Sequence, residues 1–182
     1  AVGLQQQLLA DHAVEHALFE FGLFEVRRRE RRARILGRLL AQHAQTLAVD
    51  TAAALIHVLD QKVNNLNPDY FSYTVSKLAL ERCVALQAQA LAPHVRVTGL
   101  APGLMYPSGP QSVANFERAS HVNLLRSAIN PADVARSAVF LAENSSITGV
   151  CLGVDKGQHL LPLERDVMFV VDQLASSTRG AA

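Results

Sequence analysis

A tyrosine and a lysine stand four residues apart in the stretch "DYFSYTVSKLALE", at Tyr73 and Lys77. On a helix, residues at this spacing point to the same side, so the two side chains would share a face. A phenol titrates near ~10, but a nearby ammonium favours the phenolate and lowers its pKa. A tuned tyrosine can then donate a proton to a carbonyl or imine group as hydride arrives. The same spacing is also typical of the polar edge of an ordinary surface helix, so the pair alone establishes no site.

Two apolar runs on either side of this pair end in residues that could belong to the same site. The run "AAALIHVLD" ends in Asp60, thirteen residues before Tyr73, and is typical of a strand buried on both faces of a parallel sheet. The run "VRVTGLAP" predicts a second buried strand, which ends at Pro102 and Gly103. Open α/β sheets place their sites at the carboxyl ends of parallel strands. We therefore expect Asp60, Tyr73 and the Pro102–Gly103 pair to converge at one edge of the sheet.

The elements that must position these residues form an α/β pattern. A helix is expected from about Tyr70 to Leu91, where Pro93 stops it, and a short helix over residues 115–126. Asn130 and Pro131 are typical of a helix start, and the run "TGVCLGVDKG" predicts a third strand followed by a turn. Residues 4–24 and 25–48 predict two N-terminal helices. Strands that alternate with helices indicate a thin parallel sheet of about three strands with flanking helices.

The composition is that of a globular chain. Of its 182 residues, 49% are hydrophobic and 18% are charged, which is enough apolar material for one core. The formal net charge of +1 gives no overall attraction to nucleic acid or to a membrane. No apolar run approaches the ~18 residues of a membrane span, and the first residues lack the layout of a secretion signal. Cys83 and Cys151 are far apart, so we expect reduced, buried thiols in a cytoplasmic protein.

Residues from about 54 to 172 resemble the second half of a short-chain dehydrogenase/reductase. "YTVSK" matches the family's Tyr-x-x-x-Lys signature, and "VRVTGLAPG" matches the family strand that ends in Pro-Gly. "NPADVARSAVFLAENSSITGVCLGVDKG" is similar to the late helix and last strand, which usually end in Asp-Gly-Gly. The resemblance implies a partial Rossmann-like sheet over residues 51–182. It leaves residues 1–50 as a helical segment unrelated to the family pattern.

The resemblance also implies roles for the candidate site residues. The family usually has serine where this chain has Asp60, and pteridine and dihydrofolate reductases of the family also carry aspartate there. Tyr73 would be the proton donor, Lys77 the ribose binder and pKa modulator, and Asp60 a helper in proton delivery. NADP or NAD would contact Tyr73, Lys77, Pro102, Gly103 and Leu104, and no metal is implied. The implied reaction is reduction of a C=N or C=O group in a pterin-like or carbonyl small molecule, and residues 104–127 would form the substrate loop.

The nucleotide-binding part of the family pattern is missing from residues 1–50. A glycine-rich turn normally lets a helix N-terminus meet the pyrophosphate, but this segment has only Gly3, Gly22 and Gly37, in no such motif. We therefore expect this chain alone to bind NAD(P)H weakly or not at all. The segment could be native, a replacement or the product of a shifted reading frame. A second departure is Lys156, which replaces a family glycine and would be strained by about 1 kcal/mol at positive φ.

Other functions remain open at this point. The chain could be a non-catalytic family remnant that self-associates through the Tyr73 helix, and the family in any case predicts a homo-oligomer, a dimer or tetramer. "HAVEH" at residues 12–16 fits an inverted zinc-peptidase motif, with His12 and His16 as ligands and Glu15 as base. "RRRERRAR" could contact phosphate on RNA, but it is also typical of a solvated helix face, and no aromatic is interleaved with the arginines. A nucleic-acid partner is not expected.

Overall fold

The computed structural model describes residues 42, 46, 53–109 and 111–171. Their elements follow the order β1 (Ala53–Val58), a 3-10 turn η1 (Gln61–Val63), α3 (Phe71–Leu91), β2 (Val95–Pro102), α4 (Val113–Ala119), α5 (Pro131–Glu143), β3 (Cys151–Val154) and a 3-10 turn η2 (Gln158–Leu160). Residues 167–171 are also helical. The helices predicted over 4–24 and 25–48, the zinc-peptidase motif and the arginine run lie outside the described residues, apart from positions 42 and 46, which are helical.

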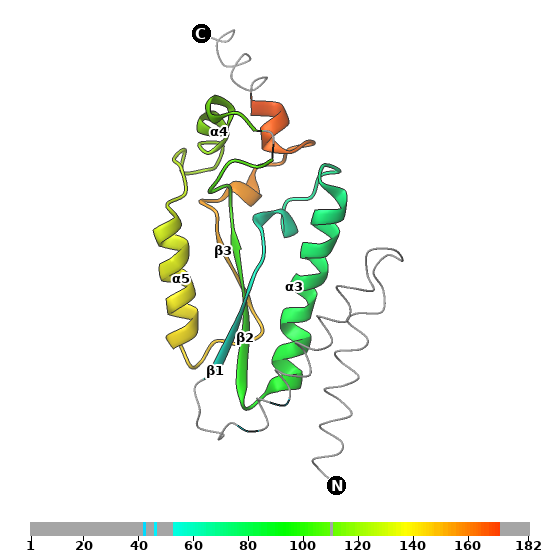
Figure 1. Cartoon of the computed structure of the whole chain (residues 1–182), viewed down its shortest axis with the longest axis vertical. Coiled ribbons are helices and arrows are strands. Elements are labelled where there is room, and N and C mark those ends of the chain that lie inside the picture. Colours follow the sequence, from blue (N-terminus) through cyan, green and yellow to red (C-terminus); the bar gives the residue numbers. More distant parts are fainter. Residues whose placement is uncertain (1–41, 43–45, 47–52, 110, 172–182) are drawn as a thin grey trace.

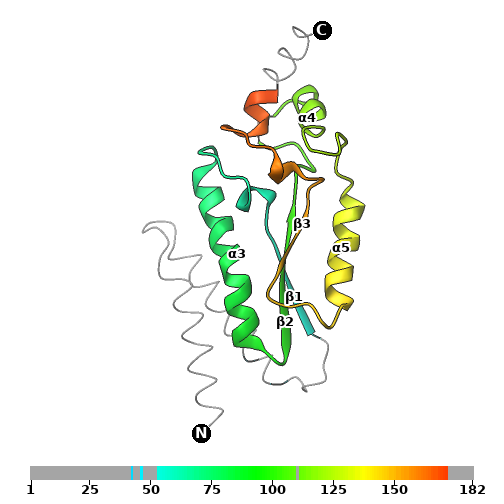
Figure 2. The same cartoon turned by 180° about the vertical axis from the view of Figure 1, so that it is seen from behind.

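The three strands form one parallel sheet in the order β1-β2-β3. Figures 1 and 2 show α3 on one face of this sheet and α5 on the other. This arrangement confirms the predicted α/β class, with about three parallel strands and flanking helices. The sheet is parallel because each crossover carries a helix across one of its faces.

Alternation along β2 divides the core between the two helices. Val97 points toward α3 and joins Val84, Ala88 and Leu91 in one buried cluster. Leu100 points the other way and packs with Leu141 of α5 in a second buried cluster. The central strand therefore holds both layers together, and residues 97–102 are buried without interruption.

Two predictions of burial are wrong for the outer strands. β1 was expected to be buried on both faces, but Ala54 is exposed and the Val58 residue is 57% exposed. Among the described strands β1 pairs with β2 alone, so it has fewer neighbours than the central strand. Cys151 was expected in the core, but it is exposed on β3, because α3 packs mainly on β2. Cys83 is half-buried.

The helix that precedes β3 is fixed at both ends. The Asn130 side chain accepts a hydrogen bond from Ala132 N at 3.0 Å, which confirms the predicted start of α5. At the other end, the Arg96 guanidinium of β2 donates to the carbonyl oxygens of Leu141 (3.0 Å), Ala142 (2.6 Å), Asn144 (2.7 Å) and Ile147 (3.2 Å). These carbonyls have no helical partner, and a cation is favourable beside them.

The short helix α4 ends sooner than predicted. It spans Val113–Ala119 rather than 115–126, and the Ser112 hydroxyl caps it by accepting from Asn115 N at 3.2 Å. The Asn123 side chain then donates to the carbonyls of Ser120 and Ser127 at 3.0 and 2.9 Å. These local bonds compete with further helix and close a turn instead.

A layer of side chains from the end of the described chain lies at the carboxyl end of the sheet. Figure 1 shows α4, in green, and the ribbon of residues 161–171, in orange and red, gathered there. Ala119, Val167 and Val171 form a third buried cluster, against which Leu104 and Leu163 pack. This layer places the last described residues beside the ends of β1 and β2, where the candidate site lies. No helix in the described ranges is long and apolar enough to cross a membrane.

Candidate active site

The structure brings Asp60 and Tyr73 together at the carboxyl end of β1. The Tyr73 hydroxyl donates to Asp60 Oδ2 at 2.7 Å. Asp60 caps η1, and its other oxygen, Oδ1, accepts a hydrogen bond from Lys62 N at 2.8 Å. Tyr73 reaches the carboxylate from the first turn of α3. The carboxylate is therefore oriented by the backbone on one side and by the phenol on the other.

Lys77 lies on the same face of α3 as Tyr73, as the spacing predicts. Its ammonium nitrogen is 5.6 Å from the centre of the Tyr73 ring. It donates a hydrogen bond to the carbonyl oxygen of Val58, at the end of β1, at 2.8 Å. The lysine thus ties α3 to the strand that carries Asp60.

The expected direction of the Tyr73 pKa is wrong for this arrangement. Burial, the hydrogen bond to Asp60 and the charge of Asp60 raise the pKa of the Tyr73 phenol well above its ordinary value. Proximity to Lys77 was expected to lower this pKa. Its ammonium is held by the Val58 carbonyl and lies over the ring, whereas the carboxylate accepts the phenolic proton directly. The Tyr73 phenol therefore holds its proton more tightly than an ordinary phenol does.

The Pro102–Gly103–Leu104 segment lies at the end of the neighbouring strand. Val58 is opposite Leu100 in the sheet, so Pro102 lies two residues beyond the end of β1. Leu104 N donates to Gln158 Oε1 at 2.9 Å. A β-carbon at Gly103 would lie 2.6 Å from that same oxygen and 2.6 Å from Ile129 Cδ1, so glycine is needed for this close approach. The segment shares the sheet edge with Asp60 and Tyr73.

The turn after β3 has the strained backbone that the sequence predicted. Lys156 has φ of 54°, and its ammonium donates to the Ser127 hydroxyl at 2.7 Å. Asp155 is 4% exposed and accepts hydrogen bonds from Gly157 N at 3.0 Å and His159 N at 2.8 Å. The His159 ring contacts the same carboxylate at 2.6 Å. A buried carboxylate therefore organises this turn in spite of the lysine.

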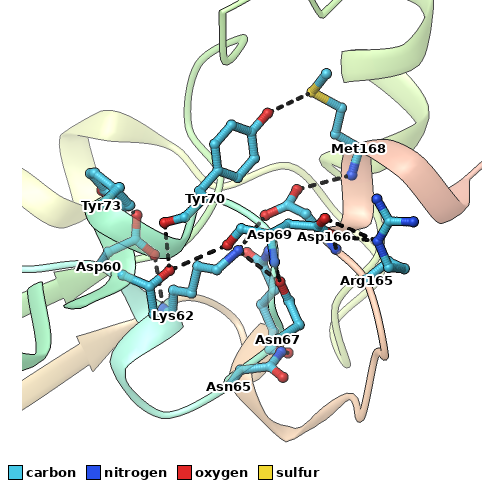
Figure 3. Close-up of polar contacts among 12 residues, drawn as sticks. Asp60, Lys62, Asn65, Asn67, Asp69, Tyr70, Tyr73, Arg165, Asp166 and Met168 are labelled. Carbon is cyan, nitrogen blue, oxygen red and sulfur yellow. Dashed lines mark hydrogen bonds and ion pairs between the residues drawn. The ribbon is translucent and has the colours of Figure 1, made fainter.

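Sequence reasoning missed a polar cluster beside the site, drawn in Figure 3. Lys62 is 3% exposed, and its ammonium donates to Asp166 Oδ2 at 3.0 Å and to Asn67 Oδ1 at 2.9 Å. Asp69 accepts hydrogen bonds from Arg165 Nε and from Asp166 N, at 2.8 and 2.7 Å. Lys62 and Asp69 belong to the segment that follows β1, and their partners Arg165 and Asp166 lie about a hundred residues further on. No local pattern in the sequence could have indicated these pairs.

The chemical groups at this edge are organic side chains and backbone amides. Within the described ranges, no three His, Cys, Asp or Glu side chains gather closely enough to hold a metal ion. The groups available at the site are a phenol, a carboxylate, an ammonium and backbone amides. Such groups can bind hydroxyl-bearing ligands and can hold or move a proton.

Comparison with protein families identifies the class of protein that this fold and site define. Residues 38–159 match the family model described as enoyl-(acyl carrier protein) reductase. The chain therefore belongs to the short-chain dehydrogenase/reductase family. The match starts at residue 38, before the boundary predicted at residue 51.

Within this family, the chain is similar to pteridine-type reductases. It is 29% identical over 125 residues to dihydromonapterin reductases of Citrobacter koseri and Escherichia coli, which covers 69% of this chain and 50% of each relative. The structure of FolM alternative dihydrofolate reductase 1 from Brucella canis, complexed with NADP, matches with a TM-score of 0.64 and 36% identity. That match covers 74% of this chain and 56% of the Brucella chain. A putative short-chain dehydrogenase/reductase from Burkholderia xenovorans matches with a TM-score of 0.58 and 25% identity, over 70% of this chain and 50% of that one. The chain thus spans about half the length of the curated relatives it matches.

Proposed function

We propose that this chain carries the proton-donor half of an NAD(P)H-dependent short-chain reductase that reduces a C=N or C=O group, with a pterin-like substrate favoured. The observation that carries the proposal is the 2.7 Å hydrogen bond between Tyr73 and Asp60, with Lys77 on the same helix face. The similarity to dihydromonapterin and dihydrofolate reductases supports the substrate class. The carbonyl alternative stays open, since the proton-donor chemistry is the same.

Tyr73 is the proton donor in this proposal. When bound, a reduced nicotinamide supplies hydride to the substrate carbon, and the neighbouring nitrogen or oxygen needs a proton. A phenol is protonated at neutral pH, so the proton is available, and the raised pKa means that Tyr73 is a weaker acid while its hydroxyl is bonded to Asp60. To deliver it, the hydroxyl turns from Asp60 to the substrate, and the Lys77 ammonium beside the ring stabilises the phenolate that is left. Asp60 holds the hydroxyl before transfer and relays the replacing proton.

The donor set at the edge of the sheet fits the nicotinamide end of a cofactor. The Tyr73 hydroxyl and the Lys77 ammonium can donate to ribose hydroxyls, and the Pro102–Gly103–Leu104 segment lines the end of the next strand. The Brucella relatives were solved as complexes with NADP, which favours NADP over NAD for this chain. Residues 1–50 carry no glycine-rich turn for the pyrophosphate, so the proposal assigns this chain only the nicotinamide end.

The experiment is NADPH oxidation with a dihydropterin substrate at high NADPH concentration, measured for the wild-type chain, Tyr73→Phe and Ser146→Ala. Ser146 is exposed in the loop before β3, at the end of the sheet opposite the candidate site, and its replacement also removes one hydroxyl. Turnover by the wild-type chain should fall by about 100-fold or more in Tyr73→Phe, the size of a general-acid contribution, and should be unchanged in Ser146→Ala. If wild type and Tyr73→Phe are equally inactive, the enzyme proposal fails for this chain alone.

A second candidate is a non-catalytic family member that self-associates through α3. Two apolar residues of this helix favour it, since Phe71 is 72% and Leu86 is 49% exposed. A dimer or tetramer would bury them. We expect Leu86→Glu to shift the sedimentation of the chain toward a monomer, and Gln89→Glu, the same charge on an exposed site of the same helix, to leave it unchanged. A wild-type chain that sediments as a monomer would exclude this candidate.

A further inference from the structure

Lys62 is a buried cation, and apolar packing alone does not explain its burial. Its side chain is 4% exposed, and removing an ammonium from water is costly unless it is paired. Here it is paired on three sides, by Asp166 Oδ2 at 3.0 Å, by Asn67 Oδ1 at 2.9 Å and by the Tyr70 ring, whose centre is 5.2 Å away. These three partners, Asp166, Asn67 and the Tyr70 ring, form a cradle that holds the Lys62 ammonium in one place.

The backbone of the same residue holds Asp60. Lys62 N donates to Asp60 Oδ1 at 2.8 Å, while Asp60 Oδ2 accepts the Tyr73 hydroxyl. The position of Lys62 N is set by the turn η1, whose middle residue is Lys62 itself. Figure 3 shows Lys62 between the Asp60–Tyr73 pair and Asp166. The contacts that hold Lys62 in place therefore also hold the Asp60 carboxylate, which the Tyr73 hydroxyl contacts.

The far side of the cradle comes from the end of the described chain. Asp166 follows Lys62 by 104 residues, and Asp166 N donates to Asp69 Oδ2 at 2.7 Å. Arg165 donates twice to Asp69, at 3.0 and 2.8 Å. The same two segments therefore meet through several bonds, and the cradle is rigid on both sides.

The start of α3 depends on the same segment. Tyr70 has φ of 54°, a left-handed conformation that is unfavourable for a residue with a side chain. Its ring stacks on Phe169 with centroids 6.1 Å apart, and its hydroxyl donates to Met168 Sδ at 3.3 Å. These contacts offset the cost and fix the direction in which the first turn of α3, with Tyr73, leaves the loop.

We propose that Lys62 is a positioning residue: its ammonium, clamped by Asp166 and Asn67, fixes the turn η1 so that Asp60 is aimed at the Tyr73 hydroxyl. Segment 163–171 is thereby part of the support of the site, although it contributes no group that contacts the phenol. This positioning role rests on the proposed function. The Asp60–Tyr73 hydrogen bond that Lys62 supports is present whether or not the chain turns over a substrate.

The test observes that hydrogen bond directly. The chain has three tyrosines, Tyr70, Tyr73 and Tyr106, so the protein labelled with [13Cζ]tyrosine gives three ring resonances that Tyr→Phe variants assign. The Cζ shift responds to the hydrogen bond of the hydroxyl. Asp60→Ala supplies the shift of Tyr73 with the bond removed.

Lys62→Met keeps an unbranched chain of similar length and removes the charge. We expect it to move the Tyr73 resonance more than half of the way from wild type to Asp60→Ala. Asp166→Asn, from the other side of the cradle, should move it in the same direction. Lys156→Met is the matched control, because it removes another lysine with a side-chain hydrogen bond, to Ser127, and should leave the Tyr73 resonance in place.

Removing one member of a buried pair can unfold a protein, so far-UV circular dichroism accompanies each variant. The double variant Lys62→Met/Asp166→Asn leaves no unpaired charge, and Asp166→Asn alone changes a side chain that is 22% exposed. Folded variants with an unmoved Tyr73 resonance would overturn the proposal, as would an equal shift in Lys156→Met. Absence of reductase activity in the wild-type chain would contradict the proposed function, but it would leave this comparison of resonances unaffected.

Discussion

At the scale of single residues, the central contact of the candidate site is the hydrogen bond between Tyr73 and Asp60. The Tyr73 hydroxyl gives its hydrogen bond to Asp60, and both burial and that carboxylate oppose ionisation of the phenol. Lys77, on the same helix face, acts on the ring rather than on the hydroxyl. The Tyr73 pKa should therefore fall, and the phenol become a stronger acid, when its hydroxyl moves away from Asp60.

Replacing the carboxylate should therefore make Tyr73 more acidic. Asp60→Asn keeps an oxygen that can accept the hydroxyl proton but removes the negative charge, so we expect the Tyr73 pKa to fall. The pKa is measured by following the [13Cζ]tyrosine resonance against pH. Glu117→Gln removes an exposed carboxylate of α4 and should leave the pKa unchanged. A Tyr73 pKa equal in Asp60→Asn and wild type would contradict the assignment of its cause.

The raised pKa also predicts how stability depends on alkaline pH. The folded state holds the Tyr73 proton more tightly than the unfolded state, so this contribution is complete below the ordinary value of 10.0. It is lost as the pH rises through 10.0 toward the folded-state pKa, because only the unfolded chain then releases the proton. We expect the free energy of unfolding of Tyr73→Phe to fall less steeply than that of wild type above about pH 10. Urea unfolding at a series of pH values measures both slopes, and parallel slopes would contradict the prediction.

At the scale of elements, the ends of strands and helices are held by side chains that come from elsewhere in the chain. Arg96 of β2 caps the last turn of α5, Gln158 holds the backbone of Leu104, and the cradle around Lys62 fixes the turn after β1. Each of these bonds satisfies a polar group that its own element leaves without a partner. Side chains from distant parts of the chain therefore hold the turns at the ends of the sheet.

Gly103→Ala should disturb the carboxyl edge of the sheet. The added carbon would lie 2.6 Å from Gln158 Oε1 and 2.9 Å from Asp155 Cβ, so the turn after β3 would have to shift. We expect a loss of about 1–3 kcal/mol in the free energy of unfolding, the usual cost of overpacking. The control is Gly153→Ala on β3, where the nearest atom is an ordinary 3.9 Å away. A Gly103→Ala chain as stable as Gly153→Ala in urea would show that the turn adapts freely.

At the scale of the whole molecule, the described strands form a three-stranded parallel sheet of a short-chain dehydrogenase/reductase, and the Asp60–Tyr73 pair lies at its carboxyl edge. The chain spans about half the length of the relatives it matches, and those matches cover 69–74% of this chain. Every contact described above is made among residues 53–109 and 111–171.

We expect this chain alone to bind NADPH weakly or not at all. Residues 1–50 lack the glycine-rich turn that would bring a helix N-terminus to the pyrophosphate, so the nicotinamide end would have to provide most of the affinity. A titration followed by NADPH fluorescence measures it, with the Brucella canis relative, which was solved with NADP, as the positive control. Micromolar affinity in this chain would contradict the prediction.

The sequence by itself determined the three strands, the Tyr73–Lys77 face and the meeting of Asp60 with Tyr73. Hydrophobic runs, helical spacing and the rule that parallel strands end at one edge are local properties, and they suffice for those predictions. Only the tertiary structure decided that the Tyr73 pKa is raised, that Cys151 is exposed and that Lys62 is clamped by Asp166. The physical reason is that pKa values and burial depend on which distant side chains surround a group. A hydrogen bond across 104 residues leaves no periodic signal in the chain.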